Sequence, residues 1–170
     1  MLKIGDKVRH KTCDPDEIGI VDEIAGYDNR YVIRWLDGGF KSTDHIDVLE
    51  PVRQKRIYIA GQMSGIPHFN FPAFHAAAAK LRDEGHEVFN PAEADIARIG
   101  VDPSLDNPTG DVALAAKRHG LSRRECLAED LSWIALNADA IALLPGWVLS
   151  SGARAEYALA EALGLEVIRL

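Results

Sequence analysis

Two short apolar segments, each followed by a polar turn and an alanine-rich helical pattern, most strongly constrain the fold of this chain. The first, 56–60, ends at Gly61, and the second, 140–144, leads through a turn rich in Gly and Ser into a helical pattern over 152–163. Buried strands that run directly into helices are typical of parallel sheets. Because ligands of such sheets bind where strands end and helices begin, the same pattern predicts the position of a site.

The order of segments from residue 56 onward predicts a Rossmann-like α/β unit, with helices on both faces of a parallel sheet. The segment 92–122 is interrupted by Asp-Pro and Asn-Pro and predicts either a lid over a site or a surface insertion. Asn70 is the predicted N-cap of the first helix. The predicted strands are 56–61, 86–91, 140–144 and 166–170, and the predicted helices are 70–85, 123–137 and 152–163.

The first 50 residues have a different pattern, in which short alternating strands are separated by turns of Asp, Gly and Asn. The stretch Leu36-Asp37-Gly38-Gly39 is a strong hairpin signal. We therefore predict a small antiparallel β-barrel of about five strands over 1–50, similar to SH3-like or Tudor-like modules. A linker at 51–55 then leads into the α/β domain over 56–170. The excess of acidic residues in the barrel favours a packing or protein-interaction module.

Aromatic residues of the barrel allow two interpretations. They form either an aromatic cage for a ligand or the core that a small barrel needs, and the second is favoured. The residues concerned are Tyr27, Tyr31, Trp35 and Phe40.

The composition argues against several classes of function. The formal net charge of −7 opposes a broad grip on a phosphate backbone, so nucleic acid is not expected as a partner. The two cysteines, Cys13 and Cys126, and the six histidines form no metal-ligand pattern, so no metal is expected. The sequence lacks Gly-x-Gly-x-x-Gly and Gly-Lys-Ser/Thr patterns, and no cofactor is expected. No apolar run is long enough for a membrane span, and we expect a cytoplasmic protein.

Two acidic residues lie beside the apolar faces of predicted helices, where a carboxylate is costly unless something requires it. Glu156 is close to the start of its helix, where the helix dipole is expected to keep it ionised, and Asp130 lies in the middle of the preceding helix. The alternatives are an ordinary early-helix Glu and a buried Asp that caps a loop. The expected apolar stripes are Ala155, Leu159, Ala162 and Leu163 in the last helix, and Leu127, Leu131, Ile134 and Ala138 in the one before.

Three segments carry a resemblance to a known family. They are Ile-Tyr-Ile-Ala-Gly at 57–61, Glu-Asp-Leu-Ser-Trp-Ile at 129–134, and Ser-Ser-Gly-Ala-Arg-Ala-Glu-Tyr-Ala at 150–158. In order and spacing these segments resemble the nucleoside 2-deoxyribosyltransferase-like superfamily, which includes base-exchanging transferases and deoxynucleoside monophosphate N-glycosidases. Asn-Phe-Pro-Ala-Phe at 70–74 is similar to a branch of largely uncharacterised bacterial and phage domains. The resemblance covers about 56–170 and leaves out the barrel.

The resemblance implies roles for individual residues. Glu156 corresponds to the nucleophile, Asp130 to the acid that handles the leaving base, and Tyr58 to a strand-end tyrosine that orients the nucleophile. In the monophosphate hydrolases, the loop after the first strand and the turn before the nucleophile helix hold the 5′-phosphate. The first loop of this chain lacks the Arg of those hydrolases, and Arg154 is either a substitute or a solvated cation. The matching phosphate positions are Gly61, Gln62, Ser64, Ser150 and Gly152.

Other residues near these positions have two interpretations each. Ser150 and Ser151 either cap the last helix or hold a phosphate at its start. Trp147 either stacks on a base or covers the end of the sheet. Asn90 either contacts a sugar or forms the turn before Pro91. Tyr58 itself is otherwise an ordinary core tyrosine.

The predicted chemistry is cleavage of an N-glycosidic bond, by hydrolysis or 2-deoxyribosyl transfer, in a nucleoside or nucleoside 5′-monophosphate. By analogy with retaining glycosidases, the two acids should lie about 5–6 Å apart around the sugar. A non-catalytic nucleotide or ADP-ribose-type sensor, with the barrel engaging a protein partner, is the alternative. A purely structural assembly domain is a third hypothesis. The resemblance also implies a homo-oligomer, a dimer or a larger form.

Overall fold

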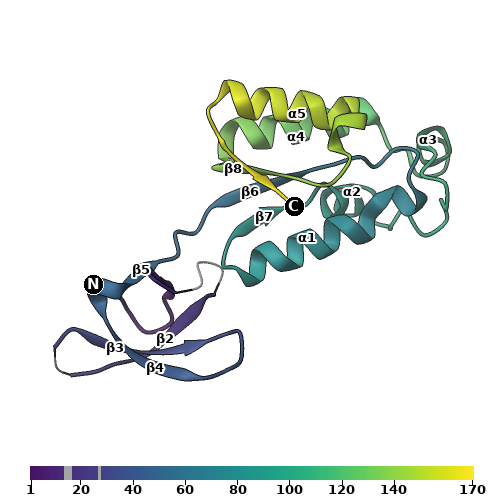
Figure 1. Ribbon diagram of the computed structural model, residues 1–170. Helices are drawn as coiled ribbons and strands as arrows, with labels where there is room; N and C mark the ends of the chain where they lie inside the picture. The colour runs from purple at the N-terminus through teal and green to yellow at the C-terminus, as the bar shows by residue number, and fades with distance from the viewer. Residues whose placement is uncertain (14–16, 27) are drawn as a thin grey trace. The chain divides into compact units, whose positions relative to one another are not determined.

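The chain forms two compact units, Met1–Gln54 and Lys55–Leu170, and each has hydrophobic clusters of its own (Figure 1). The computed structural model describes residues 1–13, 17–26 and 28–170. Asp14, Asp16 and Tyr27 of the predicted barrel therefore lie outside the described residues.

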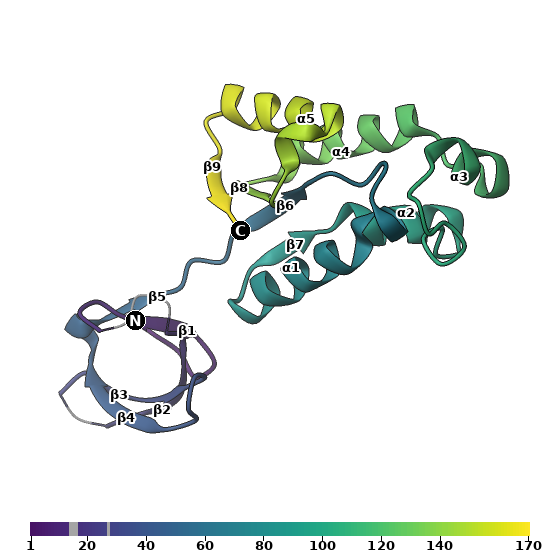
Figure 2. The same ribbon diagram turned by 45° about the vertical axis from the view of Figure 1, so that its right-hand side comes forward.

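The N-terminal unit is a five-stranded antiparallel sheet with strand order β4-β3-β2-β1-β5, which confirms the predicted short antiparallel strands. The predicted hairpin is also confirmed, because β3 and β4 pair on either side of residues 36–40. The sheet curls strongly about itself (Figure 2). Its elements are β1 (Lys7–His10), β2 (Gly19–Ile24), β3 (Arg30–Trp35), β4 (Lys41–His45), the 3₁₀ turn η1 (Ile46–Val48) and β5 (Leu49–Pro51).

The described aromatic residues of this sheet do not form a ligand cage. Tyr31 and Trp35 alternate with exposed positions on β3 and are each only 3% exposed, so they belong to the core. The Trp35 ring nitrogen donates a hydrogen bond to Ser42 Oγ at 2.6 Å. Phe40 is 53% exposed and stacks against Trp35 from outside. The cage interpretation is therefore wrong for these residues, because a small sheet needs its large side chains to fill its interior.

The C-terminal unit is an α/β fold whose four strands are all parallel, in the order β7-β6-β8-β9. This confirms the predicted class. Helices α4 and α5 cover one face of the sheet, and α1 lies on the other (Figure 1). The strands are β6 (Arg56–Ala60), β7 (Glu87–Phe89), β8 (Ala140–Leu143) and β9 (Glu166–Arg169). The helices are α1 (Phe71–Asp83), α2 (Pro91–Ile99), α3 (Val112–His119), α4 (Arg123–Asn137) and α5 (Ser151–Ala162), with 3₁₀ turns η2 (Pro67–Asn70) and η3 (Trp147–Leu149).

The alternation along β6 separates two cores. Ile57 and Ile59 belong to the cluster that contains α1, whereas Tyr58 and Ala60 belong to the cluster of α4 and α5. Because successive side chains of a strand point to opposite faces, β6 is buried on both sides. Tyr58 therefore points toward α4 and α5, and it is the residue of β6 that brings a polar group to this face of the sheet.

The segment 92–122 is more regular than predicted, because most of it is helical. Helix α2 is capped by Asn90, whose side-chain oxygen accepts a hydrogen bond from the Ala92 amide at 3.0 Å, and it ends at Gly100. Helix α3 is capped by Asp111 and ends at Gly120. The predicted interruptions at 102–103 and 106–110 lie in the non-helical stretch between these two helices and are confirmed, whereas the helices on either side were not predicted.

The loop after β6 contains a turn of three non-glycine residues in the left-handed region, His68, Phe69 and Asn70. Asn70 was the predicted N-cap of α1, but its side chain makes no capping bond, because the left-handed φ of 60° turns it away. Its side-chain nitrogen instead donates to the Gln62 carbonyl at 3.0 Å. His68 Nδ1 hydrogen-bonds with the Ser104 carbonyl at 2.8 Å. Left-handed non-glycine residues are strained, so these bonds hold the turn in place.

The same loop is held by Gly110, and this gives a testable prediction. The Gly110 carbonyl accepts a hydrogen bond from the Gly65 amide at 2.9 Å, and a Cβ on Gly110 would lie 2.2 Å from the Ile66 carbonyl oxygen. We expect Gly110→Ala to lower the free energy of unfolding by about 2–5 kcal/mol in urea titrations. Gly120→Ala is the matched control, since it also has a positive φ but meets nothing within 4 Å; it should cost only about 1–2 kcal/mol. Equal losses of unfolding free energy in the two variants would contradict the inference that Gly110 is required for its close approach to Ile66.

Candidate active site

Tyr58 is the centre of a buried aromatic group on the α4/α5 side of the sheet. It is fully buried, stacks on Phe89 with ring centroids 5.5 Å apart, and lies 6.3 Å from the ring of Trp133. It occupies the middle of β6 rather than the strand end that the resemblance implied. The packing holds the phenol ring in one orientation, so its hydroxyl has a defined position between the two helices.

Glu156 and Asp130 both reach this hydroxyl. They are only 7% and 8% exposed, and each lies within hydrogen-bonding reach of Tyr58. The two carboxyl groups also act on each other, because the charge of Asp130 raises the pKa of Glu156. The structure thus brings together three residues from β6, α4 and α5 that are far apart in the sequence.

The helices turn these acids inward more completely than predicted. In α5 the buried residues are Ala153, Glu156 and Ala160, whereas Leu163 of the expected apolar stripe is 47% exposed. In α4 the buried residues are Asp130 and Ile134. The predicted stripes are confirmed at Ile134 and in part at Leu159 and Ala138, which pack against the core, but Glu156 and Asp130 are buried on the inner face instead of lying at its border.

Burial dominates the electrostatics of the pair. Loss of hydration, followed by the charge of Asp130, raises the pKa of Glu156 to about 8. Loss of hydration, followed by the charge of Asp95, raises the pKa of Asp130 to about 7. Hydrogen bonding to Tyr58 opposes both shifts in part. Burial also raises the pKa of Tyr58 well above its usual value, so this hydroxyl remains a donor.

The expectation that Glu156 is ionised in the free protein is therefore wrong at neutral pH. The dipole of α5 is worth about 0.3–1 kcal/mol, which is less than the cost of removing a carboxylate from water. Between pH 7 and 8 the two acids together hold about one proton. A pair in this state contains both a proton donor and a carboxylate, the two groups that general acid and nucleophilic catalysis require.

The start of α5 lies next to the Glu156 carboxyl group. A Cβ built on Gly152 would be 3.7 Å from Glu156 Oε1, so the bare glycine leaves space beside this oxygen. Ser150 is the N-cap, and its hydroxyl oxygen accepts a hydrogen bond from the Ala153 amide at 3.2 Å. The capping interpretation of Ser150 is therefore confirmed. The N-terminal amides and dipole of α5 make this end of the helix electropositive.

A cation that the sequence did not indicate lies at the same turn. Arg123, at the start of α4, donates a hydrogen bond to Ser151 Oγ at 2.5 Å. Arg154, the predicted substitute for the missing first-loop arginine, is on an exposed position of α5. No local pattern could reveal Arg123, because its contact joins the starts of two helices that are far apart in the sequence.

The predicted residues of the first loop serve mainly local packing. A Cβ on Gly61 would lie 2.8 Å from a Leu144 methyl group and 3.0 Å from the Phe74 ring, which explains the glycine without a ligand. The Gln62 side chain donates to the Ser64 carbonyl at 3.1 Å. Ser64 is exposed and lines a cavity described below. A phosphate contact of these three residues stays a prediction.

Asn90 and Trp147 also have partners within the protein. Asn90 is 2% exposed, caps α2 and hydrogen-bonds with His75 at 3.2 Å, which corresponds to its turn-forming interpretation. Trp147 packs on Tyr157, with ring centroids 4.7 Å apart. Contacts of either residue with a sugar or a base stay predictions.

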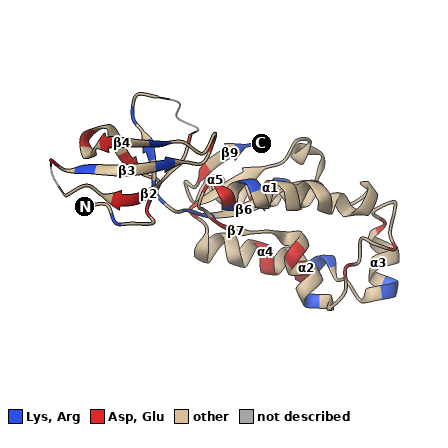
Figure 3. Cartoon of the chain, turned by 90° about the horizontal axis from the view of Figure 1, so that it is seen from below, with Lys and Arg blue, Asp and Glu red and all other residues tan. Residues whose placement is uncertain are grey.

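A third buried acid, which the sequence pattern did not indicate, lies where α2 and α4 pack together. Asp95 is 7% exposed, and its Oδ1 accepts from Arg98 at 3.2 Å. Arg98 also donates to Cys126 Sγ at 2.7 Å and pairs with Glu129. Figure 3 shows acidic residues on both α2 and α4, which contact each other. Asp95 could have been found as an acid between Ala92 and Ile99, if the helix itself had been predicted.

Asp95 lines a cavity of about 90 Å³ beside the first loop. Its walls are largely apolar and come from the first loop, η2, α3 and the chain just before α4, and Ser64, Arg123 and Cys126 contribute polar atoms. Cys126 and Asp130 are one turn apart on α4, so the cavity and the acid pair lie on the same side of this helix. The apolar lining consists of Met63, Phe69, Phe71, Val112 and Leu121.

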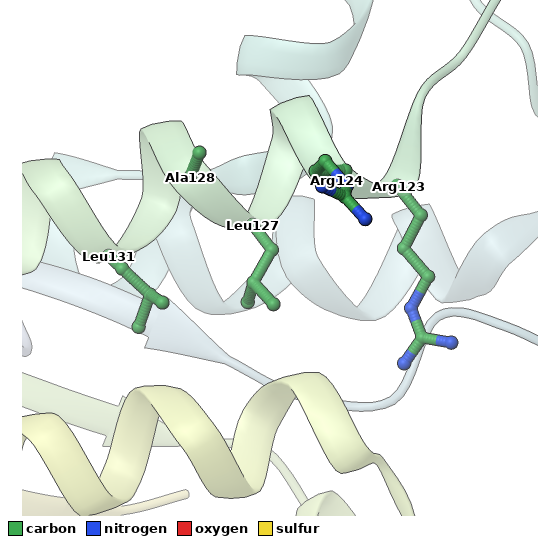
Figure 4. Close-up of a pocket in the computed structure, with 5 residues that line it drawn as sticks. All are labelled: Arg123, Arg124, Leu127, Ala128 and Leu131. Carbon is green, nitrogen blue, oxygen red and sulfur yellow. The ribbon is translucent and has the colours of Figure 1, made fainter.

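A shallow groove of about 580 Å³ runs along the other side of α4. Leu127 and Leu131 point from α4 toward α5, and Arg123 and Arg124 lie at one end (Figure 4). The groove contains neither member of the acid pair. It consists largely of stripe residues that the inward rotation of the acids has left at the surface.

The described residues contain no group of three or more His, Cys, Asp or Glu side chains that could hold a metal ion. None of the helices in the described part of the chain has the length and apolar character needed to cross a membrane.

The fold and the site define an α/β protein with a buried Tyr-Glu-Asp cluster, preceded by a small antiparallel sheet. Residues 55–169 match the family model described as a domain of unknown function, DUF4406, and the chain belongs to this family. No curated protein and no solved structure matches the chain.

Because the pKa values of the two acids are raised in the folded protein, the pair lowers the free energy of unfolding at alkaline pH. A carboxyl group with a folded-state pKa above its unfolded value holds a proton that the unfolded chain has lost, so stability falls between about pH 4.5 and pH 8. We expect Glu156→Gln to raise the free energy of unfolding at pH 8 by about 2–4 kcal/mol and to change it little at pH 4. Thermal unfolding at both pH values measures this.

Glu125→Gln is the matched control, because it removes the same charge from an exposed position on α4. It should change stability by less than about 0.5 kcal/mol at both pH values. A Glu156→Gln protein that is less stable than the wild type at pH 8 would show that Glu156 is ionised and paired in the fold.

Proposed function

We propose that the C-terminal unit cleaves the N-glycosidic bond of a nucleoside or a nucleoside 5′-monophosphate, by hydrolysis or by 2-deoxyribosyl transfer. The observation that carries this proposal is the contact of two buried carboxyl groups with one tyrosine hydroxyl. Two carboxyl groups around one sugar, about 5–5.5 Å apart, are the catalytic groups of retaining glycosidases. The resemblance to the 2-deoxyribosyltransferase-like superfamily supports the same chemistry.

In this proposal the pair begins the reaction with one proton. Because Glu156 has the higher pKa, the proton resides mainly on Glu156, and the reactive form is the minor one with the proton on Asp130 and a carboxylate on Glu156. Asp130 passes this proton to the departing base, and the electron pair of the C1′–N bond leaves with that base. The Glu156 carboxylate then forms a bond to C1′, because positive charge develops on the sugar ring. Water or a second base displaces Glu156 and returns a proton to Asp130. Tyr58 donates to the carboxylate and orients it throughout.

The 5′-phosphate, where present, would bind at the start of α5. The helix N-terminus attracts anions, and Arg123 contributes a guanidinium that already contacts Ser151. This arrangement offers a replacement for the arginine that the first loop lacks. Gly152 leaves the approach to Glu156 open from the same side.

We also propose that the protein forms a homo-oligomer through α4 and η3. Leu136 is 79% exposed, Leu149 is 76% exposed and Val148 is 53% exposed, which is unusual for large apolar residues unless another surface covers them. Sedimentation as a monomer at micromolar concentration would contradict this proposal.

The N-terminal sheet, which exposes Leu36 and Phe40, is proposed as a module for a protein partner.

Release of free base tests the proposed reaction. The full chain is incubated with a panel of deoxynucleosides, ribonucleosides and their 5′-monophosphates, and the bases are quantified by chromatography. We expect Glu156→Ala to reduce the rate by about 10³-fold or more, Asp130→Asn by about 10²-fold, and Tyr58→Phe by about 10-fold. Glu161→Gln, on an exposed position of the same helix, should leave the rate unchanged.

The pH dependence of the same assay tests the assignment of the two acids. Because one acid must be ionised and the other protonated, the rate should be highest between about pH 7 and pH 8 and fall on both sides. Asp130→Asn removes a charge that raises the pKa of Glu156, so the acidic limb should move to lower pH. If no member of the panel loses its base but one nucleotide raises the melting temperature, the nucleotide-sensor alternative replaces the enzyme.

A further inference from the structure

The cavity beside Asp95 has the composition of a site for a planar ring that carries N–H donors. Apolar and aromatic side chains form most of the wall, including Phe69 and Phe71, and a buried carboxyl group lies among them. Ligand sites generally combine an apolar lining with a few directed polar groups. A phosphate does not fit this description, because the Asp95 carboxylate would repel it.

Asp95 retains acceptor positions for such a ligand. A carboxylate has about four lone-pair sites on its two oxygens. Arg98 donates to one oxygen at 3.2 Å, and the Cys126 thiol also hydrogen-bonds with the carboxyl group. The remaining positions suit N–H groups that enter the cavity. Burial raises the pKa of Asp95, and the charge of Arg98 opposes this shift and so favours the carboxylate form.

The strained turn provides a second, independent reason to regard the cavity as functional. Phe69, which lines the cavity, has a φ of 53° and is one of three successive left-handed residues. Each such residue costs about 1–3 kcal/mol, and strain of this kind is concentrated at functional sites. The bonds from His68 to Ser104 and from Asn70 to Gln62 maintain this conformation. The position of the Phe69 ring is therefore maintained at a cost in folding free energy.

The cavity also lies in the correct place relative to the acid pair. Cys126, on its wall, precedes Asp130 by one helical turn, a rise of about 6 Å. The charge of Asp95 acts directly on Asp130. A base that accepts a proton from Asp130 would therefore have its far edge near Asp95.

We propose that this cavity binds the nucleobase and that Asp95 selects bases with an exocyclic amino group over their oxo counterparts. This inference rests on the proposed function for the identity of the ligand as a nucleobase. In cytosine and adenine the amino group directs hydrogens at the carboxylate. In uracil and hypoxanthine a carbonyl oxygen takes that place, and its lone pairs face the lone pairs of Asp95.

Binding of free bases tests the proposal without any requirement for catalysis. Isothermal titration calorimetry of the full chain compares two matched pairs, cytosine with uracil and adenine with hypoxanthine. We expect the amino member of at least one pair to bind about 10-fold or more tightly than its oxo counterpart. In Asp95→Asn, which presents an amide instead of the carboxylate, the ratio should fall to about 3-fold or less, or invert.

Two further variants complete the experiment. Val112→Phe adds a ring at another lining position and leaves Asp95 intact, so it should abolish binding of every base even if Asp95→Asn fails to fold. Glu125→Gln removes an exposed charge from α4 and should preserve the ratio. Equal affinity within both pairs, a ratio that Asp95→Asn leaves unchanged, or no binding of any base by the wild type would each overturn the proposal.

The outcome is separable from that of the proposed reaction. Discrimination between amino and oxo bases without any release of base from nucleosides would contradict the reaction and retain the base site. Release of base at equal rates from amino and oxo substrates, with equal affinities for the free bases, would retain the reaction and contradict the role of Asp95.

Discussion

The C-terminal unit depends on the burial of two carboxyl groups against the hydroxyl of Tyr58. Removing Glu156 and Asp130 from water is unfavourable, and hydrogen bonding to Tyr58, together with the charge of Arg98 near Asp130, offsets part of the cost. With these acids turned inward, part of the apolar stripe expected for α5 faces solvent, and Leu163 at its end is 47% exposed. A chain selected for stability alone would place leucine at the positions of the acids. The arrangement therefore indicates a function that requires the acids.

Much of the fold could be predicted because the strands and most helix ends carry strong local signals. The apolar runs that became β6 and β8 are buried on both faces, and such runs are typical of parallel strands. The prediction failed for α2 and α3, because Asn90-Pro91 was assigned to the end of a strand and both helices are short, at nine and eight residues. It also failed at Asn70, since a residue type favoured at N-caps tolerates the left-handed conformation equally well.

The candidate site could be predicted where an acidic residue lies among the apolar positions of a helix. Glu156 and Asp130 stand out as acids beside apolar positions, and Asp95 has the same signature within a helix that was not predicted. The position of Arg123 at Ser151 had no such signal, because it results from the packing of two helix starts. The protonation state was wrong for a quantitative reason: a helix dipole contributes less than the hydration that a buried carboxylate loses.

The order of charges along α4 gives the proposed site a direction. Arg123 lies at the start of the helix, and Cys126 follows beside the Asp95 cavity. Asp130 comes next, at a rise of about 10 Å along the helix axis from Arg123. The guanidinium and the N-terminus of α5 attract an anion, whereas the Asp95 carboxylate repels one and accepts N–H donors. A nucleoside monophosphate has these two requirements at opposite ends, with its C1′ between them. The same helix can therefore help to determine how the substrate is oriented, and it places Asp130 one turn beyond Cys126 on the cavity wall.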